Sequence, residues 1–406
     1  DGVTEGPEAA LRPRLRPLDI RRLGDVLVLR DPLGLCPQEL LVPAHLAPLL
    51  GLLDGTRDLT AVQASFQLLT GRYVSLSQLE ELVVRLDASL LLDTPSFQEA
   101  YQRALEEFRS APFRPPALAD QVYPGDVQAL SQALDGYLQA APPPEEAANA
   151  VGIISPHIDY GRGWRVYAQV WGAARRAILE AELVIALGTD HAGGPGAITL
   201  TRQSYATPYG VLPTYSTAVE ELAEALGEEA FVQELHHRRE HSLELALVWL
   251  HHLRGGRPVP VVPVLCGSFA PYVEGELEAA SDAKLEMTLR ILASHMQGKR
   301  ALVVAAADLS HVGPTFGDPF PWGLMERAHL RGADGKLLAA MEAVDAAAFL
   351  GEVRACRDRY RICGLPPIYM ALRLLAGHRG RVLAYEQCPA DPQGGSLVSI
   401  AGALIL

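Results

Sequence analysis

The chain has 406 residues, which at roughly 150 residues per domain predicts two or three domains. Lys and Arg total 35 against 48 Asp and Glu, so the formal net charge is −13. This balance excludes a nucleic-acid binder, because binding a phosphate backbone depends on clustered cationic side chains. Hydrophobic residues make up 49% of the chain, which is enough to bury sizeable cores and excludes wholesale disorder.

The same composition argues against a membrane or secreted protein. No apolar run reaches the roughly 18 residues that a membrane-spanning helix needs. The first 30 residues alternate charged residues and Pro with single apolar residues, so no secretory signal is visible. Five widely spaced cysteines do not form the pattern of a disulfide framework. We therefore expect a soluble, cytoplasmic protein with no membrane partner.

Residues 1–110 have the pattern of a small, mostly helical module. Apolar residues at helical spacing follow a short strand, and a second strand closes the module. This arrangement resembles a winged-helix or PqqD-like peptide-binding module, and an accessory or dimerisation domain is the alternative. The expected elements are a strand at Asp25–Arg30, helices within Val42–Leu53, Thr60–Thr70 and Ser77–Ala88, and a returning strand at Leu90–Asp93.

A Pro-rich stretch at residues 111–117 predicts a linker, because proline runs continue neither helices nor central strands. From residue 118 to residue 406, continuous apolar strands alternate with helices. That alternation predicts an α/β domain, with a mainly parallel sheet sandwiched between helices. The expected strands include Val151–Ser155, Leu183–Gly188, Val259–Leu265, Ala301–Ala306, Arg381–Tyr385 and Leu397–Ile405, and the expected helices include Asp126–Leu138, Glu240–Leu253, Glu274–His295, Leu337–Leu350 and Pro366–Leu375.

Three histidines directly follow predicted strands. His157 comes after Val151–Ser155, His191 after Leu183–Gly188, and His311 after the strand that leads into Asp308. Sites in parallel sheets form beyond the carboxyl ends of the strands, so these rings meet if the strands are neighbours. Neutral imidazole is the commonest transition-metal ligand, so the three histidines indicate a metal site.

Cys363 is a fourth candidate, because Pro366 and Pro367 suit the first turn of a following helix. A thiol just ahead of a helix N-terminus lies at the positive end of the helix dipole, which favours the thiolate. A thiolate is both a soft ligand and a nucleophile, so a hydrolase that uses Asp308, His311 and Cys363 is also conceivable.

The segment around residue 240 spells a further motif. His237, Glu240 and His241 have the H-x-x-E-H spacing of inverted zinc peptidases, in which both histidines bind zinc and the glutamate activates water. The alternative is that Glu240, His241 and Glu244 line or brace the same crevice as the strand-end histidines.

Six short motifs follow one another along the chain: Pro156-His157-x-x-Tyr160, Gly188-x-x-His191, Glu240-His241-Ser242-x-Glu244, Pro263-Val264-Leu265-Cys266-Gly267, Asp308-x-Ser310-His311 and Ile362-Cys363-Gly364. In this order and spacing they resemble the MEMO family, also called AmmeMemoRadiSam system protein B. The resemblance covers about residues 118–406 and includes the opening Tyr123–Asp126 and the closing Ser399–Ala403.

The resemblance implies a fold similar to class III extradiol dioxygenases and a mononuclear iron or copper site. It assigns His157, His191 and Cys363 to the metal, and His311 to acid/base catalysis. Asp308 and His241 would line the same pocket. It further implies a small-molecule ligand or a peptide in the crevice, and a radical-SAM protein as a possible partner.

The third ligand would be Cys363 where the related dioxygenases use a carboxylate, which makes the site softer. The chain also departs from the MEMO family at several positions. Ile158 and Asp159 replace a small flexible pair, and Ala192 and Ala246 stand where some members have histidine. Asp159, together with Asp190, is a candidate acceptor for the second nitrogen of a ligand histidine. Two functions follow as hypotheses: a metal-dependent redox enzyme acting on a small molecule, or a non-catalytic metal- or peptide-binding partner protein.

Overall fold

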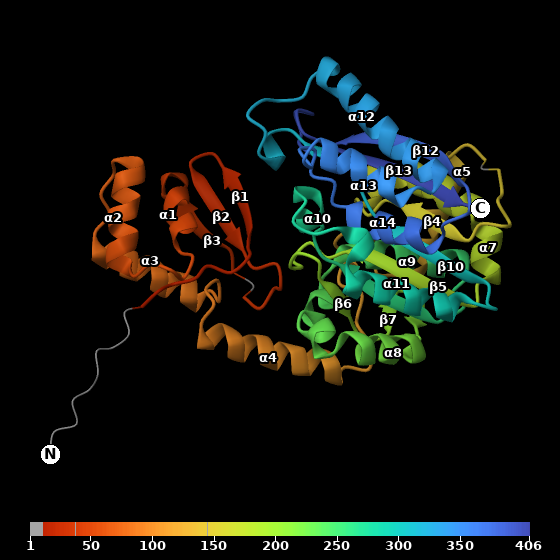
Figure 1. The fold of residues 1–406 in the computed structure, drawn as a ribbon, viewed down its shortest axis with the longest axis horizontal. Helices are drawn as coiled ribbons and strands as arrows, with labels where there is room; N and C mark the ends of the chain where they lie inside the picture. Colours follow the sequence, from red (N-terminus) through yellow and green to blue (C-terminus); the bar gives the residue numbers. More distant parts are fainter. Residues whose placement is uncertain (1–10, 37, 144) are drawn as a thin grey trace. The chain divides into compact units, whose positions relative to one another are not determined.

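The computed structural model describes residues 11–36, 38–143 and 145–406, which divide into two compact units at Ser110 and Ala111 (Figure 1). Unit 1 contains a three-stranded antiparallel sheet in the order β1-β2-β3, packed with helices around its own apolar core. Its elements are β1 Asp19–Leu23, β2 Val26–Arg30, β3 Leu40–Pro43, α1 Ala47–Leu52, α2 Leu59–Thr70, α3 Leu76–Ala88 and α4 Pro95–Ser110.

Two expectations for unit 1 are corrected. The stretch expected to be helical from Val42 begins instead with β3, and its helix α1 starts only at Ala47. The returning strand at Leu90–Asp93 is reduced to a single bridge between Leu92 and Leu15, because Leu90 turns the chain with a φ of 55°. The PqqD-like character of this unit stays a prediction.

Unit 2 is an α/β domain built on an eight-stranded mixed sheet. The order β11-β13-β4-β10-β5-β9-β6 has four adjacent parallel strands at its centre (β4, β10, β5 and β9), and β12 pairs with β13. The strands are β4 Gly152–Ser155, β5 Leu183–Thr189, β6 Ile198–Leu200, β9 Val261–Cys266, β10 Ala301–Ala306, β11 His311–Val312, β12 Gly380–Pro389 and β13 Leu397–Ile405, with a separate β7–β8 hairpin at Tyr205–Thr207 and Gly210–Leu212. The α/β prediction is confirmed.

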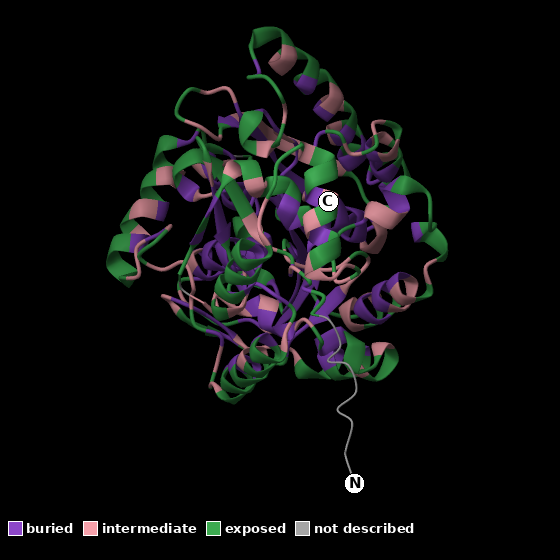
Figure 2. Cartoon of the chain, turned by 90° about the vertical axis from the view of Figure 1, so that its left-hand side faces the viewer, coloured by how far each residue is buried: buried purple, intermediate pink, exposed green. Residues whose placement is uncertain are grey.

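Helices cover both faces of this sheet, because its strands alternate apolar side chains between two cores. Ile154 and Val303 belong to one core, while their neighbours Ile153 and Val304 belong to the other. Figure 2 shows buried residues on the strands and on the inward faces of the helices. One core takes α8 Ser216–Leu226, α11 Ala283–Met296, α12 Leu324–Ala343, α13 Ala346–Ala355 and α14 Leu365–Leu374; the other takes α5 Val127–Ala140, α6 Tyr160–Ala173, α7 Arg175–Glu180 and α9 His241–Leu253.

Two helices expected to be continuous are interrupted. The helix expected over Glu274–His295 is α10, Ala270–Glu274, followed by α11, because Gly275 turns the chain with a φ of 80° and Asp282 caps a new helix. Similarly, Val344 adopts a left-handed conformation and Asp345 caps α13, which splits the helix expected over Leu337–Leu350. No helix among the described residues combines the length and apolarity needed to cross a bilayer.

The Pro-rich segment 111–117 is part of unit 2 rather than a free linker, because Arg114 is fully buried there. Its guanidinium forms an ion pair with Glu244 at 2.5 Å and donates to the carbonyl oxygens of His237 (2.6 Å) and Glu240 (3.0 Å). The carboxylate of Glu244 also accepts from the backbone N–H groups of Ala117 and Leu118. This buried pair therefore ties the segment to the start of α9.

We expect Arg114→Ala to destabilise unit 2 by about 3–5 kcal/mol, because it leaves the Glu244 carboxylate buried without its cation. Denaturant unfolding measures this loss. Arg176→Ala is the matched control, since its pair with Glu180 is solvent-exposed on both sides and contributes at most about 1 kcal/mol. Equal losses in the two variants would contradict the role of Arg114.

Candidate metal centre

The carboxyl ends of the central parallel strands bring the predicted metal ligands together. β10 lies between β4 and β5, and Ala306 is in register with Ser155 on one side and Gly188 on the other. Two residues further along each strand, the chain reaches His157, Asp308 and Asp190, the last of these adjacent to His191. The register of three strands thus places two of the three predicted ligands at one edge of the sheet.

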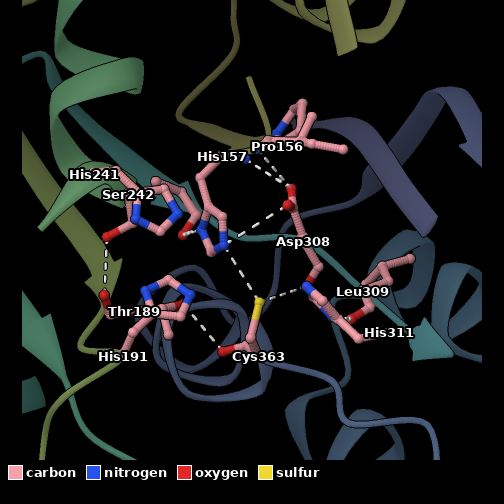
Figure 3. A network of polar contacts seen from close by, with 12 residues as sticks. Pro156, His157, Thr189, His191, His241, Ser242, Asp308, Leu309, His311 and Cys363 are labelled. Atoms are coloured by element: carbon pink, nitrogen blue, oxygen red, sulfur yellow. Dashed lines mark hydrogen bonds and ion pairs between the residues drawn. The ribbon is translucent and has the colours of Figure 1, made fainter. Parts of the chain in front are cut away.

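Cys363 reaches the same edge from the start of α14 (Figure 3). Its Sγ lies 3.3 Å from Nε2 of His157, and the donor atoms of His157, His191 and Cys363 all lie within 4.8 Å of one another. A nitrogen and a sulfur bound to one ion at a tetrahedral angle lie roughly 3.6 Å apart, so the observed spacing fits a shared ion. Two imidazoles and a thiol are donors that suit copper, iron or zinc.

Close backbone packing permits this approach of Cys363. A Cβ atom on Gly364 would lie 2.3 Å from the carbonyl oxygen of Asp308, so the residue after the cysteine has to be glycine. Thr189, at the end of β5, donates from Oγ1 to the carbonyl oxygen of Cys363 at 3.0 Å. The loop that carries the thiol is therefore fixed against both β10 and β5.

The ring of His157 is oriented by the backbone. Its Nδ1 lies 3.0 Å from the carbonyl oxygen of Ala306, which only accepts, so Nδ1 carries the proton and Nε2 presents a lone pair to Cys363. Burial lowers the pKa of His157 to about 3, and the neighbouring His191 contributes in the same direction. The ring is therefore neutral, as a metal ligand has to be.

His191 is oriented by Glu240 rather than by the aspartates expected from the sequence. Its Nδ1 lies 3.0 Å from Oε1 of Glu240. Burial alone would lower the pKa of His191, but the charge of Glu240 raises it well above its ordinary value. Asp159 instead caps α6, and Asp190 contacts Nδ1 of His236 at 2.9 Å. The hypothesis that these two aspartates orient the ligands is wrong.

The environment of the Cys363 thiol differs from the one expected. Burial raises the pKa of the thiol, and contact with His191 opposes that rise without cancelling it. The helix dipole at α14, on which the sequence argument rested, therefore does not dominate here. A metal cation bound beside Cys363 would favour the thiolate, because its positive charge stabilises the negative charge of the buried sulfur.

Asp308 and His311 lie at the same edge with different attachments. Oδ1 of Asp308 accepts from the backbone N–H groups of His157 (2.8 Å) and Ile158 (3.2 Å), so this carboxyl holds the loop after β4. Nδ1 of His311 lies 3.1 Å from the carbonyl oxygens of Leu309 and Arg361. Its proton is therefore on Nδ1, which leaves Nε2 as a bare acceptor. Burial lowers the pKa of His311, although Asp308 opposes the shift.

The zinc-peptidase set does not assemble. His237 lies in the short 3₁₀ helix Glu234–Arg238, where its two ring nitrogens contact the hydroxyl of Tyr205 (2.6 Å) and the carbonyl oxygen of Thr199 (3.0 Å). Glu240 and His241 lie at the start of α9, so the three residues do not share one helical face. The alternative, that Glu240 and His241 belong to the main crevice, agrees with the geometry.

The hydrolase set is only partly assembled. The side-chain contacts of Cys363 are with His157 and His191, whereas Nδ1 of His311 contacts two backbone carbonyls. Sequence reasoning missed the carbonyl oxygen of Ala306 and the role of Arg114, because neither a backbone acceptor nor a lone arginine among prolines forms a recognisable motif.

Comparison with known proteins identifies relatives over most of this chain. The family model described as Memo-like protein matches residues 114–404. A MEMO1 family protein of Aquifex aeolicus is 28% identical over 97% of this chain and 99% of its own length. Another, from Thermus thermophilus, is 29% identical over 86% of this chain and 99% of its own length.

A third relative, from Methanosarcina acetivorans, is 26% identical over 71% of this chain and 96% of its own length. The match therefore spans unit 2 from Arg114 almost to the end of the chain, and it includes the strand-end histidines and Cys363. The chain belongs to the Memo-like family.

Proposed function

We propose that this chain is a metalloprotein that binds one copper or iron ion through His157, His191 and Cys363. The observation that carries the proposal is the meeting of two imidazole nitrogens and one sulfur, from three distant parts of the sequence, within 4.8 Å. The thiol favours copper over iron, because thiolate is a soft ligand. Non-haem iron sites with two histidines usually have a carboxylate as the third ligand.

The proposed reaction is redox chemistry on a small molecule in the crevice. A bound copper or iron ion supplies one-electron chemistry and an open position for a small donor. His311 accepts a proton at its bare Nε2, and its neutral state at ordinary pH suits that role. Asp308 holds the backbone of His157, and His241 lines the crevice beside His191.

We expect His157→Ala and Cys363→Ser each to lose the ion, because two donors rarely retain a transition metal against chelators. Elemental analysis of protein purified anaerobically should give about one copper or iron per wild-type chain and less than a tenth of that in either variant. His329→Ala, at an exposed histidine on α12, is the control and should keep the wild-type content. Zinc that survives loss of His157 but disappears in His237→Ala would support the peptidase instead.

We expect His311→Gln to keep the metal and to slow turnover by about 10²-fold or more, because it removes the proton acceptor without removing a ligand. Oxygen uptake with a panel of catechols measures turnover, and metal content is measured on the same samples. A wild-type protein that holds its metal but consumes no oxygen with any of them would favour a binding or partner protein.

A further inference from the structure

Glu240 occupies an unusual position between the metal ligands and α9. It is the residue before α9, and its Oε1 accepts from the backbone N–H of Ser242 at 2.9 Å. Its Oε2 accepts from the backbone N–H of His191 at 3.1 Å. The same carboxylate also lies beside two imidazoles, with Nδ1 of His191 at 3.0 Å and Nδ1 of His241 at 3.2 Å.

Three N–H groups therefore donate to one carboxylate, and a fourth ring nitrogen, Nδ1 of His241, lies close to it. An ionised carboxylate accepts about four hydrogen bonds and donates none, so it matches this environment completely. An amide of the same shape has a carbonyl that accepts about two hydrogen bonds and an NH₂ group that only donates. Placed here, the NH₂ group would face N–H donors. The arrangement thus requires an acceptor on both sides of the side chain.

We propose that Glu240 is the positioning residue of the site, which keeps a proton on Nδ1 of His191 and so turns Nε2 of that ring toward the crevice. The part of this inference that concerns metal affinity rests on the proposed function. The position of the proton does not, because it follows from contacts within the chain itself.

The geometry of the two rings supports a common orientation. His191 and His241 stack with their centroids 4.6 Å apart and their planes 20° apart. Because both Nδ1 atoms lie on the side of Glu240, both Nε2 atoms lie on the opposite side. The ring of His157 approaches them edge-on, with centroids 5.0 Å from His191 and 5.1 Å from His241. Glu240 thus lies beside both the candidate ligand His191 and the neighbouring ring of His241.

Glu240 is itself held on two sides. Arg114 donates to its carbonyl oxygen at 3.0 Å. Ser242 donates from Oγ to the carbonyl oxygen of Thr189 at 2.9 Å, which ties the start of α9 to the end of β5. The carboxylate therefore keeps its place relative to His191, which follows β5 directly.

The test is Glu240→Gln, which retains the shape and can still accept from Ser242 to cap α9. In metal-free protein, ¹⁵N NMR of the imidazoles reports whether each Nδ1 is protonated. We expect a protonated Nδ1 on His191 in the wild type. In the variant, the NH₂ group can take the place of Oε2, 3.1 Å from Nδ1 of His191, so we expect that Nδ1 atom to lose its proton.

The second measurement is anaerobic titration with copper(I) against a competing chelator. We expect Glu240→Gln to weaken binding by about 10–100-fold, as for other groups that orient a ligand histidine. Asp190→Asn is the matched control, because this buried carboxylate adjoins His191 in sequence but contacts the ring of His236. It should leave copper affinity and the His191 proton unchanged. Glu240→Asp withdraws the carboxylate by one methylene, so it should also release the Nδ1 proton of His191.

Unchanged Nδ1 protonation in folded Glu240→Gln would overturn the proposal, and so would equal weakening by Asp190→Asn. If the Gln variant does not fold, a His191 ring that keeps its Nδ1 proton in Glu240→Asp would overturn it. Two copper ions per wild-type chain would also overturn it, because His191, Glu240 and His241 would then form a second metal site. A wild type that binds no metal but shows the Nδ1 proton of His191 would instead refute the proposed function alone.

Discussion

The candidate site depends on the parallel alignment of β4, β10 and β5. Parallel strands end at the same edge of a sheet, so residues that follow them at equal distances come to lie side by side. His157, Asp308 and the pair Asp190–His191 obey this relation because β10 is in register with both neighbours. A shift of one residue in either pairing would turn a ligand away from the crevice, since side chains alternate between the faces of a sheet.

Burial is the second physical constraint, and neighbouring charges decide whether it controls the pKa of each histidine. It makes His157 neutral, with a pKa of about 3, and it lowers the pKa of His241 to about 4. His191 departs from this pattern because Glu240 offsets the cost of burying a charge. The crevice therefore holds two neutral imidazoles and one ring, His191, that binds a proton readily, so a metal ion bound there would displace that proton.

The thiol of Cys363 distinguishes this site from sites built on two histidines and a carboxylate. A carboxylate is a hard, charged donor even without a metal, whereas a buried thiol carries no charge until a cation arrives. The protein therefore avoids the cost of an uncompensated buried charge in the metal-free state.

Much of this protein could be predicted from its sequence, because the signals are local. Apolar strands alternating with helices indicated the α/β domain, and the positions of His157 and His191 after the strands indicated that these residues lie at one edge of the sheet. Helix breaks were missed where a single residue decided them, as Val344 does by adopting a left-handed conformation. For Glu240, the sequence indicated only that the residue lines or braces the crevice.

Tertiary structure alone decided how the site is oriented. His191 contacts Glu240 rather than Asp190 because the start of α9 packs against the end of β5. The spacing of residues in the sequence does not predict this tertiary contact. The same holds for the carbonyl oxygen of Ala306, an acceptor that every residue type possesses. The sequence by itself determined which donor atoms were available and which strands carried them. Packing between distant segments decided which of those atoms face one another, because hydrogen-bond partners are chosen by position in space rather than by distance along the chain.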